Sequence, residues 1–208
     1  MRHALIATAL AATALVGIPV IAQNMPATAP GAHDLTRVKA GTYTVDPAHT
    51  QILFEVNHLG FSHYFGIFGD ATGTMTLDPA KPEAATVSID IPIAKLVTTS
   101  PELTAHLQKA DFFDAAKFPA ATFRSTSVTV SGETAQIAGN LTIRGITKPV
   151  VLDTRFVGAG SHPMTGAPAL GFAATTRIKR SDFGVSYGIP MVPDEVDLRI
   201  NVAFDGKK

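Results

Sequence analysis

Apolar and polar residues alternate along most of the chain after Gln51. The alternation is clearest over residues 51–57, 87–93, 170–178 and 196–204. Because successive side chains of a β-strand point to opposite faces, each of these segments has one apolar face and one polar face. Many such segments with few helical ones predict an all-β fold whose antiparallel sheet closes on itself as a barrel.

Turn residues separate the predicted strands at short and regular intervals. The strands are expected over residues 43–45, 51–60, 61–69, 73–77, 87–93, 123–130, 136–143, 149–157, 170–178 and 196–204. Segment 61–69 is aromatic and broken by glycines, so we expect a bulge or a barrel corner there. This spacing is typical of an antiparallel barrel rather than of a crossover α/β fold.

One segment has helical periodicity. Ser100 can cap a helix, Pro101 suits its first position and Glu102 suits its positive end. The spacing i, i+3, i+4, i+7 places four residues on one stripe, namely Leu103, His106, Leu107 and Ala110. The pattern predicts one short amphipathic helix that packs on the sheet and ends at residues 111–114.

The start of the chain has the pattern of a cleavable export signal. Arg2 gives a basic start, and residues 4–22 are apolar or small, with a small-residue cleavage pattern before residue 23. As a membrane anchor this stretch is weakly apolar, because it is rich in Ala and Thr. Residues 23–40 contain Pro and Gly without periodicity, which predicts a flexible N-terminal segment. We therefore expect a signal peptide over 1–22 and one barrel domain over 41–208.

The composition of the chain excludes several classes of function. The formal charge is zero, with 17 Lys and Arg against 17 Asp and Glu, so a nucleic-acid surface is not expected. The chain has no Cys, which excludes disulfides and thiolate metal sites. It has 12 Phe, all beyond residue 50, and no Trp. A Phe-rich interior suits an apolar ligand or an apolar core equally well.

Alternation assigns a set of large side chains to the inner face of the barrel. Three phenylalanines after the helix, Phe112, Phe113 and Phe118, could close one end. The alternation alone leaves open whether the inner residues fill the bore or line a cavity. Our candidate ligand-binding residues are Phe54, Val56, His58, Phe68, Ile89, Ile91, Phe112, Phe118, Phe123, Leu141, Ile143, Phe172, Ile178, Phe183 and Ile200.

Only a small number of polar residues are candidates for a binding site. We expect His58 and His106 at a cavity end, and we expect His49 to brace the turn before it. No carboxylate–His spacing fits a metal template, so no metal site is expected. Arg180 and Asp182 either orient a ligand head group or pair to lock a strand-end turn, with the next Phe in the core. His106, Arg180 and Asp182 are the head-group candidates.

Two other classes of protein fit less well. The chain lacks Gly-x-Ser-x-Gly, cysteine and a phosphate-binding glycine loop, so we do not expect an enzyme. An outer-membrane barrel also alternates, but it carries girdles of Tyr and Trp, and this chain has three scattered Tyr and no Trp.

Five motifs follow one another along the chain, at residues 43–50 with 54–60, 106–107 with 111–114, 118–125, 139–150 and 180–184. Together they resemble the YceI-like family of periplasmic proteins. Tyr43 stands where that family often has Trp, Thr50 stands where it often has Ser, and the loop after Val97 lacks its acidic-Thr pattern.

The resemblance implies a lipocalin-like extended antiparallel β-barrel in the periplasm. Such a protein would carry or sequester a long-chain isoprenoid lipid, either a polyprenyl phosphate or an isoprenoid quinone, with no other cofactor. Some members of the family are tied to stress responses. Because the tail of such a lipid comes from a bilayer, we expect transient membrane contact. A barrel edge or the loop over residues 158–171 offers a surface for a homodimer. The alternative is a stress-related interaction protein whose barrel has a packed core.

Overall fold

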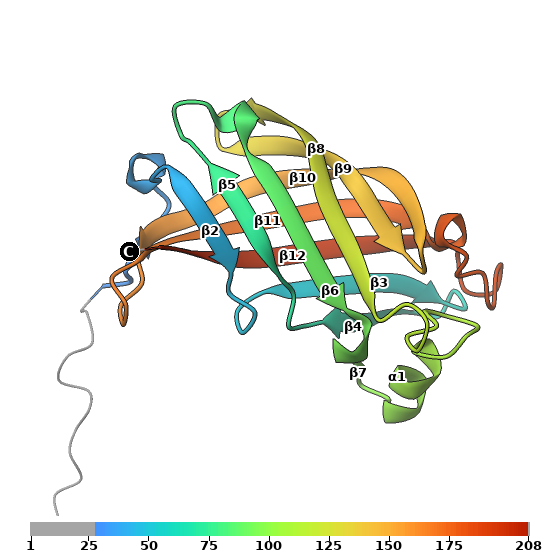
Figure 1. Cartoon of the computed structure of the whole chain (residues 1–208). Coiled ribbons are helices and arrows are strands. Elements are labelled where there is room, and N and C mark those ends of the chain that lie inside the picture. Colours follow the sequence, from blue (N-terminus) through green and yellow to red (C-terminus); the bar gives the residue numbers. More distant parts are fainter. Residues whose placement is uncertain (1–27, 208) are drawn as a thin grey trace, which may run out of the picture.

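Eight antiparallel strands close into a barrel in the computed structural model, which describes residues 28–207 (Figure 1). The last residues of the eighth strand pair with the first strand and complete the ring. The predicted all-β barrel with one short helix is confirmed. Around the ring the strands are β2 (Gly41–Val45), β5 (Thr72–Leu77), β6 (Thr86–Pro92), β8 (Ala120–Ser131), β9 (Thr134–Ile143), β10 (Ile146–Ser161), β11 (Pro168–Lys179) and β12 (Glu195–Gly206).

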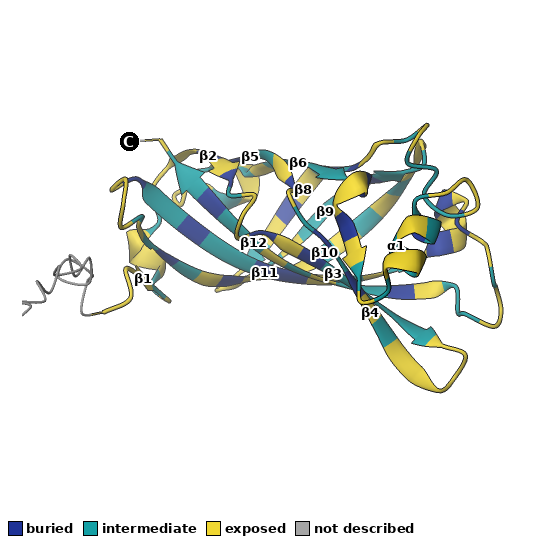
Figure 2. Ribbon diagram, turned by 90° about the horizontal axis from the view of Figure 1, so that it is seen from below, coloured by how far each residue is buried: buried dark blue, intermediate teal, exposed yellow. Residues whose placement is uncertain are grey.

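Strand β12 pairs in succession with two different strands along one edge. Its residues 204–206 pair with β2, whereas residues 197–201 pair with β3 (Gln51–His58). Strand β3 pairs with β4 (Ser62–Phe68), and β4 pairs with β7 (Leu96–Thr98). The wall therefore continues as β3, β4 and β7 near the start of β12, at the end that also carries α1 (Figure 2). We call this the helix end, and the opposite end the far end.

The helix α1 (Pro101–Leu107) begins where the sequence predicts. The Ser100 hydroxyl accepts a hydrogen bond from the Leu103 N–H at 3.2 Å, and proline occupies the first turn. The helix ends at Leu107, and a turn of hydrogen-bonded backbone follows it. Among residues 28–207, no helix has the length and apolarity needed to cross a bilayer. The described part of the chain also forms four 3₁₀ helices, η2 (Leu35–Arg37), η3 (Pro82–Ala84), η4 (Ile93–Lys95) and η5 (Arg180–Phe183).

Glycines admit aromatic rings into the wall. The sequence predicts a bulge or a barrel corner in segment 61–69. Strands β3 and β4 pair without a register shift, so there is no bulge between them. A β-carbon at Gly66 would overlap the ring of Phe54, its partner on β3. A β-carbon at Gly139 on β9 would likewise overlap the ring of Phe123 on β8, although the register partner of Gly139 is Ser125. Here glycine provides room for a ring on the neighbouring strand.

Part of the predicted flexible segment is built into the barrel. Residues 31–32 form β1 (Gly31–Ala32), which pairs with β10, and the His33 ring hydrogen-bonds with the Glu133 carboxylate at 2.8 Å. A side chain at Gly158 or Gly160 would crowd the backbone of this segment, so these two glycines let it approach. The ordered structure therefore begins before residue 41. The predicted signal peptide, residues 1–22, lies outside the described residues.

A cluster around Tyr43 forms part of the core at the far end. The Tyr43 side chain is almost fully buried, and its hydroxyl donates to the Lys39 carbonyl at 2.6 Å. Phe156, Leu170 and Phe204 pack in the same cluster. A buried phenol needs a polar partner, and the Lys39 carbonyl supplies one.

A candidate site in the barrel lumen

The lumen contains two cavities with predominantly apolar walls. One cavity, of about 350 Å³, lies at the helix end. The other, of about 420 Å³, lies toward the far end. No residue lines both. The inner side chains therefore leave unfilled space instead of packing solidly across the bore, and each cavity falls in the size range of small-molecule pockets.

The strand alternation of the sequence is visible in the cavity walls. On β12, Val196 and Leu198 line the helix-end cavity, while Ile200, Val202 and Phe204 line the far-end cavity. The intervening residues belong to the outer face. One strand thus serves both cavities, one after the other along its length.

Most of the predicted ligand-binding residues line one of the two cavities. The far-end cavity takes Ile89, Phe172 and Ile200. Phe123 lines neither, being buried against Gly139, and Phe118 packs near Gly145 outside both. Contact of any of these residues with a ligand stays a prediction. The helix-end cavity takes Phe54, Val56, His58, Phe68, Ile91, Phe112, Leu141, Ile143, Ile178 and Phe183.

Sequence reasoning missed the loop over residues 184–194, which lies between η5 and β12. Tyr187, Met191 and Val192 of this loop line the helix-end cavity. Its glycines and prolines are typical of a turn, which hid its role. The usable signal was its apolar character, because residues 183–193 contain no Lys, Arg, Asp or Glu.

Three rings form a cluster in the wall of the helix-end cavity. The ring centroids of His106 and Phe112 lie 5.0 Å apart, those of His106 and Tyr187 5.4 Å, and those of Phe112 and Tyr187 5.2 Å. The His106 Nε2 atom hydrogen-bonds with the Asp111 carboxylate at 2.6 Å. This hydrogen bond holds the pKa of Asp111 below its ordinary value. The cluster joins α1, the turn after it and the loop over residues 184–194.

Arg180 holds that loop in place. Its side chain is buried, with 8% of the residue exposed. The guanidinium donates to the carbonyls of Val185 at 3.1 Å, Tyr187 at 2.8 Å, Val192 at 2.8 Å and Pro193 at 2.9 Å. Burial lowers the pKa of Arg180, although an arginine stays charged. The four carbonyls occupy most of its five N–H donors, so the geometry favours a structural role over head-group binding.

The predicted pairing of Asp182 with Arg180 is not found. It is exposed and lines a shallow groove on the outer face with Lys148 and Lys179, outside the lumen. Asp194 locks the turn instead, accepting from the Ser181 N–H at 2.8 Å and the Ser181 hydroxyl at 2.7 Å. A carboxylate two residues after an arginine suggested the pairing, but the 3₁₀ turn η5 separates the two side chains.

A second arginine holds the turn after the helix. Arg144, between β9 and β10, donates to the carbonyls of Ala110 and Phe112. Sequence reasoning did not single out this residue. Two buried or half-buried cations therefore bind backbone carbonyls of the two segments that surround the helix end.

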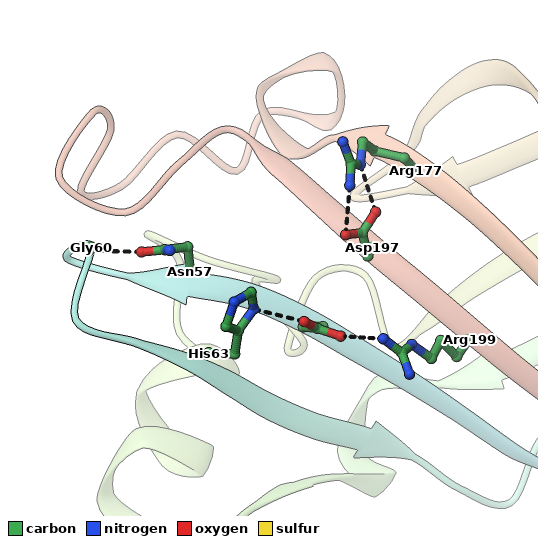
Figure 3. A network of polar contacts seen from close by, with 7 residues as sticks. Asn57, Gly60, His63, Arg177, Asp197 and Arg199 are labelled. Carbon is green, nitrogen blue, oxygen red and sulfur yellow. Dashed lines mark hydrogen bonds and ion pairs between the residues drawn. The ribbon is translucent and has the colours of Figure 1, made fainter.

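The outer face of β3, β11 and β12 is polar (Figure 3). The Glu55 carboxylate contacts the His63 ring at 2.6 Å and the Arg199 guanidinium at 2.9 Å. Arg177 donates two hydrogen bonds to the Asp197 carboxylate. Within residues 28–207, no group of three His, Cys, Asp or Glu side chains could hold a metal ion.

The remaining histidine expectations can be placed. His49 hydrogen-bonds to Asp46 at 2.5 Å and so braces the turn before it, as predicted. His58 is exposed, packs near the Tyr64 ring and lines the helix-end cavity.

Comparisons with known proteins agree with this architecture. The model of the YceI-like domain matches residues 43–204. A UPF0312 protein from Azotobacter vinelandii is 40% identical over 166 residues, which are 78% of this chain and 86% of that protein. The crystal structure of BcnA from Burkholderia cenocepacia is similar with a TM-score of 0.68 and 25% identity, over 76% of this chain and 98% of that chain.

A third similar protein is a polyisoprenoid binding domain from Saccharophagus degradans, implicated in plant cell wall breakdown. Its TM-score is 0.61 at 14% identity, over 81% of this chain and 100% of that chain. At this identity the similarity concerns the fold alone.

Proposed function

The chain belongs to the YceI-like family, and on this premise we propose that it binds a long-chain isoprenoid lipid in the barrel lumen and carries or sequesters it. The observation that carries the proposal is a hollow lumen with two predominantly apolar cavities. A barrel with a packed core, the alternative for an interaction protein, would lack this space. The Saccharophagus degradans domain, which shares the fold, is a polyisoprenoid binding domain, and this supports the ligand class.

The free energy of burying such a lipid tail indicates that the protein takes the lipid from a bilayer rather than from water. An eight-isoprene tail has about forty carbons, and burying it from water is worth roughly 30 kcal/mol at about 0.8 kcal/mol per CH₂. In a bilayer the tail is already out of water, so the hydrophobic term for transfer into the lumen is near zero. Selectivity then rests on the fit of the tail, on head-group contacts and on access to the cavity.

We place the head group at the helix end. His58 and His106 line that cavity, and their imidazole groups can donate to a phosphate or to a quinone oxygen. Arg180 also lines it, but carbonyls engage most of its donors. In this proposal the protein is exported to the periplasm and catalyses no reaction. Either head group, phosphate or quinone, fits this proposal, because the tail provides the shared chemistry.

The test is the mass of what the protein holds. We expect native mass spectrometry and organic extraction of the purified full chain to recover one isoprenoid lipid. Ile91→Asp places a charge in the helix-end cavity and should lose the lipid. Thr129→Asp is exposed on β8 and serves as the control that keeps the lipid. Recovery of no lipid from the natural chain, or equal retention by both variants, contradicts the proposal.

A further inference from the structure

Exposed apolar side chains gather at the helix end of the barrel. Phe61, in the turn between β3 and β4, is 87% exposed, and Met191, in the loop before β12, is 69% exposed. Leu59, Tyr187 and Ile189 are also exposed in these two segments. Figure 2 shows the β3–β4 hairpin projecting from the barrel at the end that carries α1. We call these five residues the apolar rim.

The apolar rim is continuous with the cavity. Leu59, Tyr187 and Met191 are exposed to solvent, and the same three residues line the helix-end cavity. An apolar molecule could therefore move from outside the barrel to the lumen along apolar surface. Such a connection distinguishes the rim from apolar residues scattered singly over a protein surface.

The two segments that carry the rim are free of formal charge. Residues 56–69 and 183–193 contain no Lys, Arg, Asp or Glu. A formal charge in these segments would oppose entry into an apolar medium, because a charge is costly to remove from water.

Much of their backbone is also satisfied internally. The Gly60 N–H donates to the Asn57 side chain at 2.6 Å (Figure 3), and the Phe61 N–H donates to the His58 carbonyl at 3.0 Å. Arg180 binds four carbonyls of the other segment. Both segments can therefore leave water without exposing these groups unpaired.

We propose that the apolar rim docks the helix end onto a lipid bilayer, so that the ligand passes between bilayer and lumen without crossing water. The inference rests on the proposed function, since an isoprenoid lipid resides in a bilayer and is costly to move through water. Phe61 and Tyr187 are ring side chains of the kind that anchor proteins at the membrane interface. A protein partner is the other occupant, and the test below separates the two.

The absence of tryptophan from the chain allows a direct test. Phe61→Trp places a single tryptophan on the rim, and Met164→Trp places one in the β10–β11 turn at the far end, where Met164 is also 87% exposed. We expect vesicles of phosphatidylcholine with one quarter phosphatidylglycerol to shift the emission of the Phe61→Trp chain to the blue. Lipids brominated in the acyl chains should quench it, while the Met164→Trp chain keeps its emission. Equal responses, or none, overturn the docking surface and leave a protein partner as its occupant.

A second variant separates docking from lipid binding. Phe61→Ser should weaken vesicle binding by about tenfold or more, because a Phe side chain no longer leaves water. Since Phe61 does not line either cavity, its melting temperature and bound lipid mass should match the natural chain. Lipid recovered from a chain that ignores vesicles overturns docking alone. Vesicle binding by a chain that never yields lipid overturns the proposed function alone.

Discussion

At the scale of single residues, Arg180 explains how a loop without charges keeps its shape. Four carbonyls of residues 185–193 point at one buried guanidinium, which replaces the water that would otherwise satisfy them. The loop can then present apolar side chains both to the cavity and to the outside. A lysine ammonium, which has three N–H donors on one nitrogen, could not bind four carbonyls in this geometry.

Removing this side chain should cost more stability than ligand affinity. We expect Arg180→Ala to lower the free energy of unfolding by about 3 kcal/mol or more, since four buried acceptors lose a charged donor. Arg177→Ala is the matched control, because its pair with Asp197 lies on the exposed outer face and is worth about 1 kcal/mol or less. Urea denaturation measures both. If Arg180→Ala loses its bound lipid while its free energy of unfolding stays close to that of the natural chain, Arg180 is a head-group residue.

The turn that carries Arg180 also has a predicted pH dependence. Hydrogen bonds from Ser181 hold the pKa of Asp194 below its ordinary value. A carboxyl group with a lowered folded-state pKa stabilises the fold above its unfolded pKa of about 3.9, and this contribution is lost as the pH falls through the folded pKa. We expect Asp194→Asn to flatten the acid side of the stability profile measured between pH 2 and 6. Ser181→Ala, which keeps only the backbone donor, should give part of the effect, and a profile unchanged in both variants contradicts the assignment.

At the scale of elements, β4 shows why glycine occurs inside a strand. Gly66→Ala would push a methyl group into the ring of Phe54, and overpacking of this kind costs about 1–3 kcal/mol. Gly69→Ala is the control, because no atom lies within 4 Å of a β-carbon there. Thermal unfolding should separate the two variants. Phe54→Leu should partly rescue Gly66→Ala; without rescue, the ring is not the cause.

The strands and the helix show which elements the sequence could predict. Period-two alternation located the strands, and the Ser100 cap located α1, because both depend on residues close together in the chain. The glycines of segment 61–69 were ambiguous, since a bulge and a ring on a neighbouring strand need the same residue. Only the pairing of β3 with β4 decides between them.

Distant contacts set the limit of the prediction. Strand β1 depends on Gly158 and Gly160, more than a hundred residues away, so local composition suggested a flexible segment. The loop over residues 184–194 contains turn residues, and its place in the cavity wall follows from the carbonyls that Arg180 binds. The inner-face residues could be predicted by alternation, whereas their division between two cavities required the closed barrel.

At the scale of the whole molecule, the two cavities raise the question of how far a ligand reaches. Strand β12 has 12 residues and is therefore about 40 Å long, and it lines the helix-end cavity first and the far-end cavity second. A long extended tail has room only if it occupies both. With the head group at the helix end, the end of the tail would lie in the far-end cavity.

Two matched substitutions test this arrangement, because each cavity has a buried alanine in its wall. Ala121 lines the helix-end cavity and Ala174 lines the far-end cavity. Ala174→Phe should shorten the available bore and shift the bound lipids toward fewer isoprene units, at nearly unchanged occupancy. Ala121→Phe obstructs the end where the tail enters and should lower the occupancy for every length. Native mass spectrometry reads both quantities at once. If Ala174→Phe leaves the lipid masses unchanged while Ala121→Phe removes the lipid, the tail ends within the helix-end cavity and the far-end cavity takes no part in binding it.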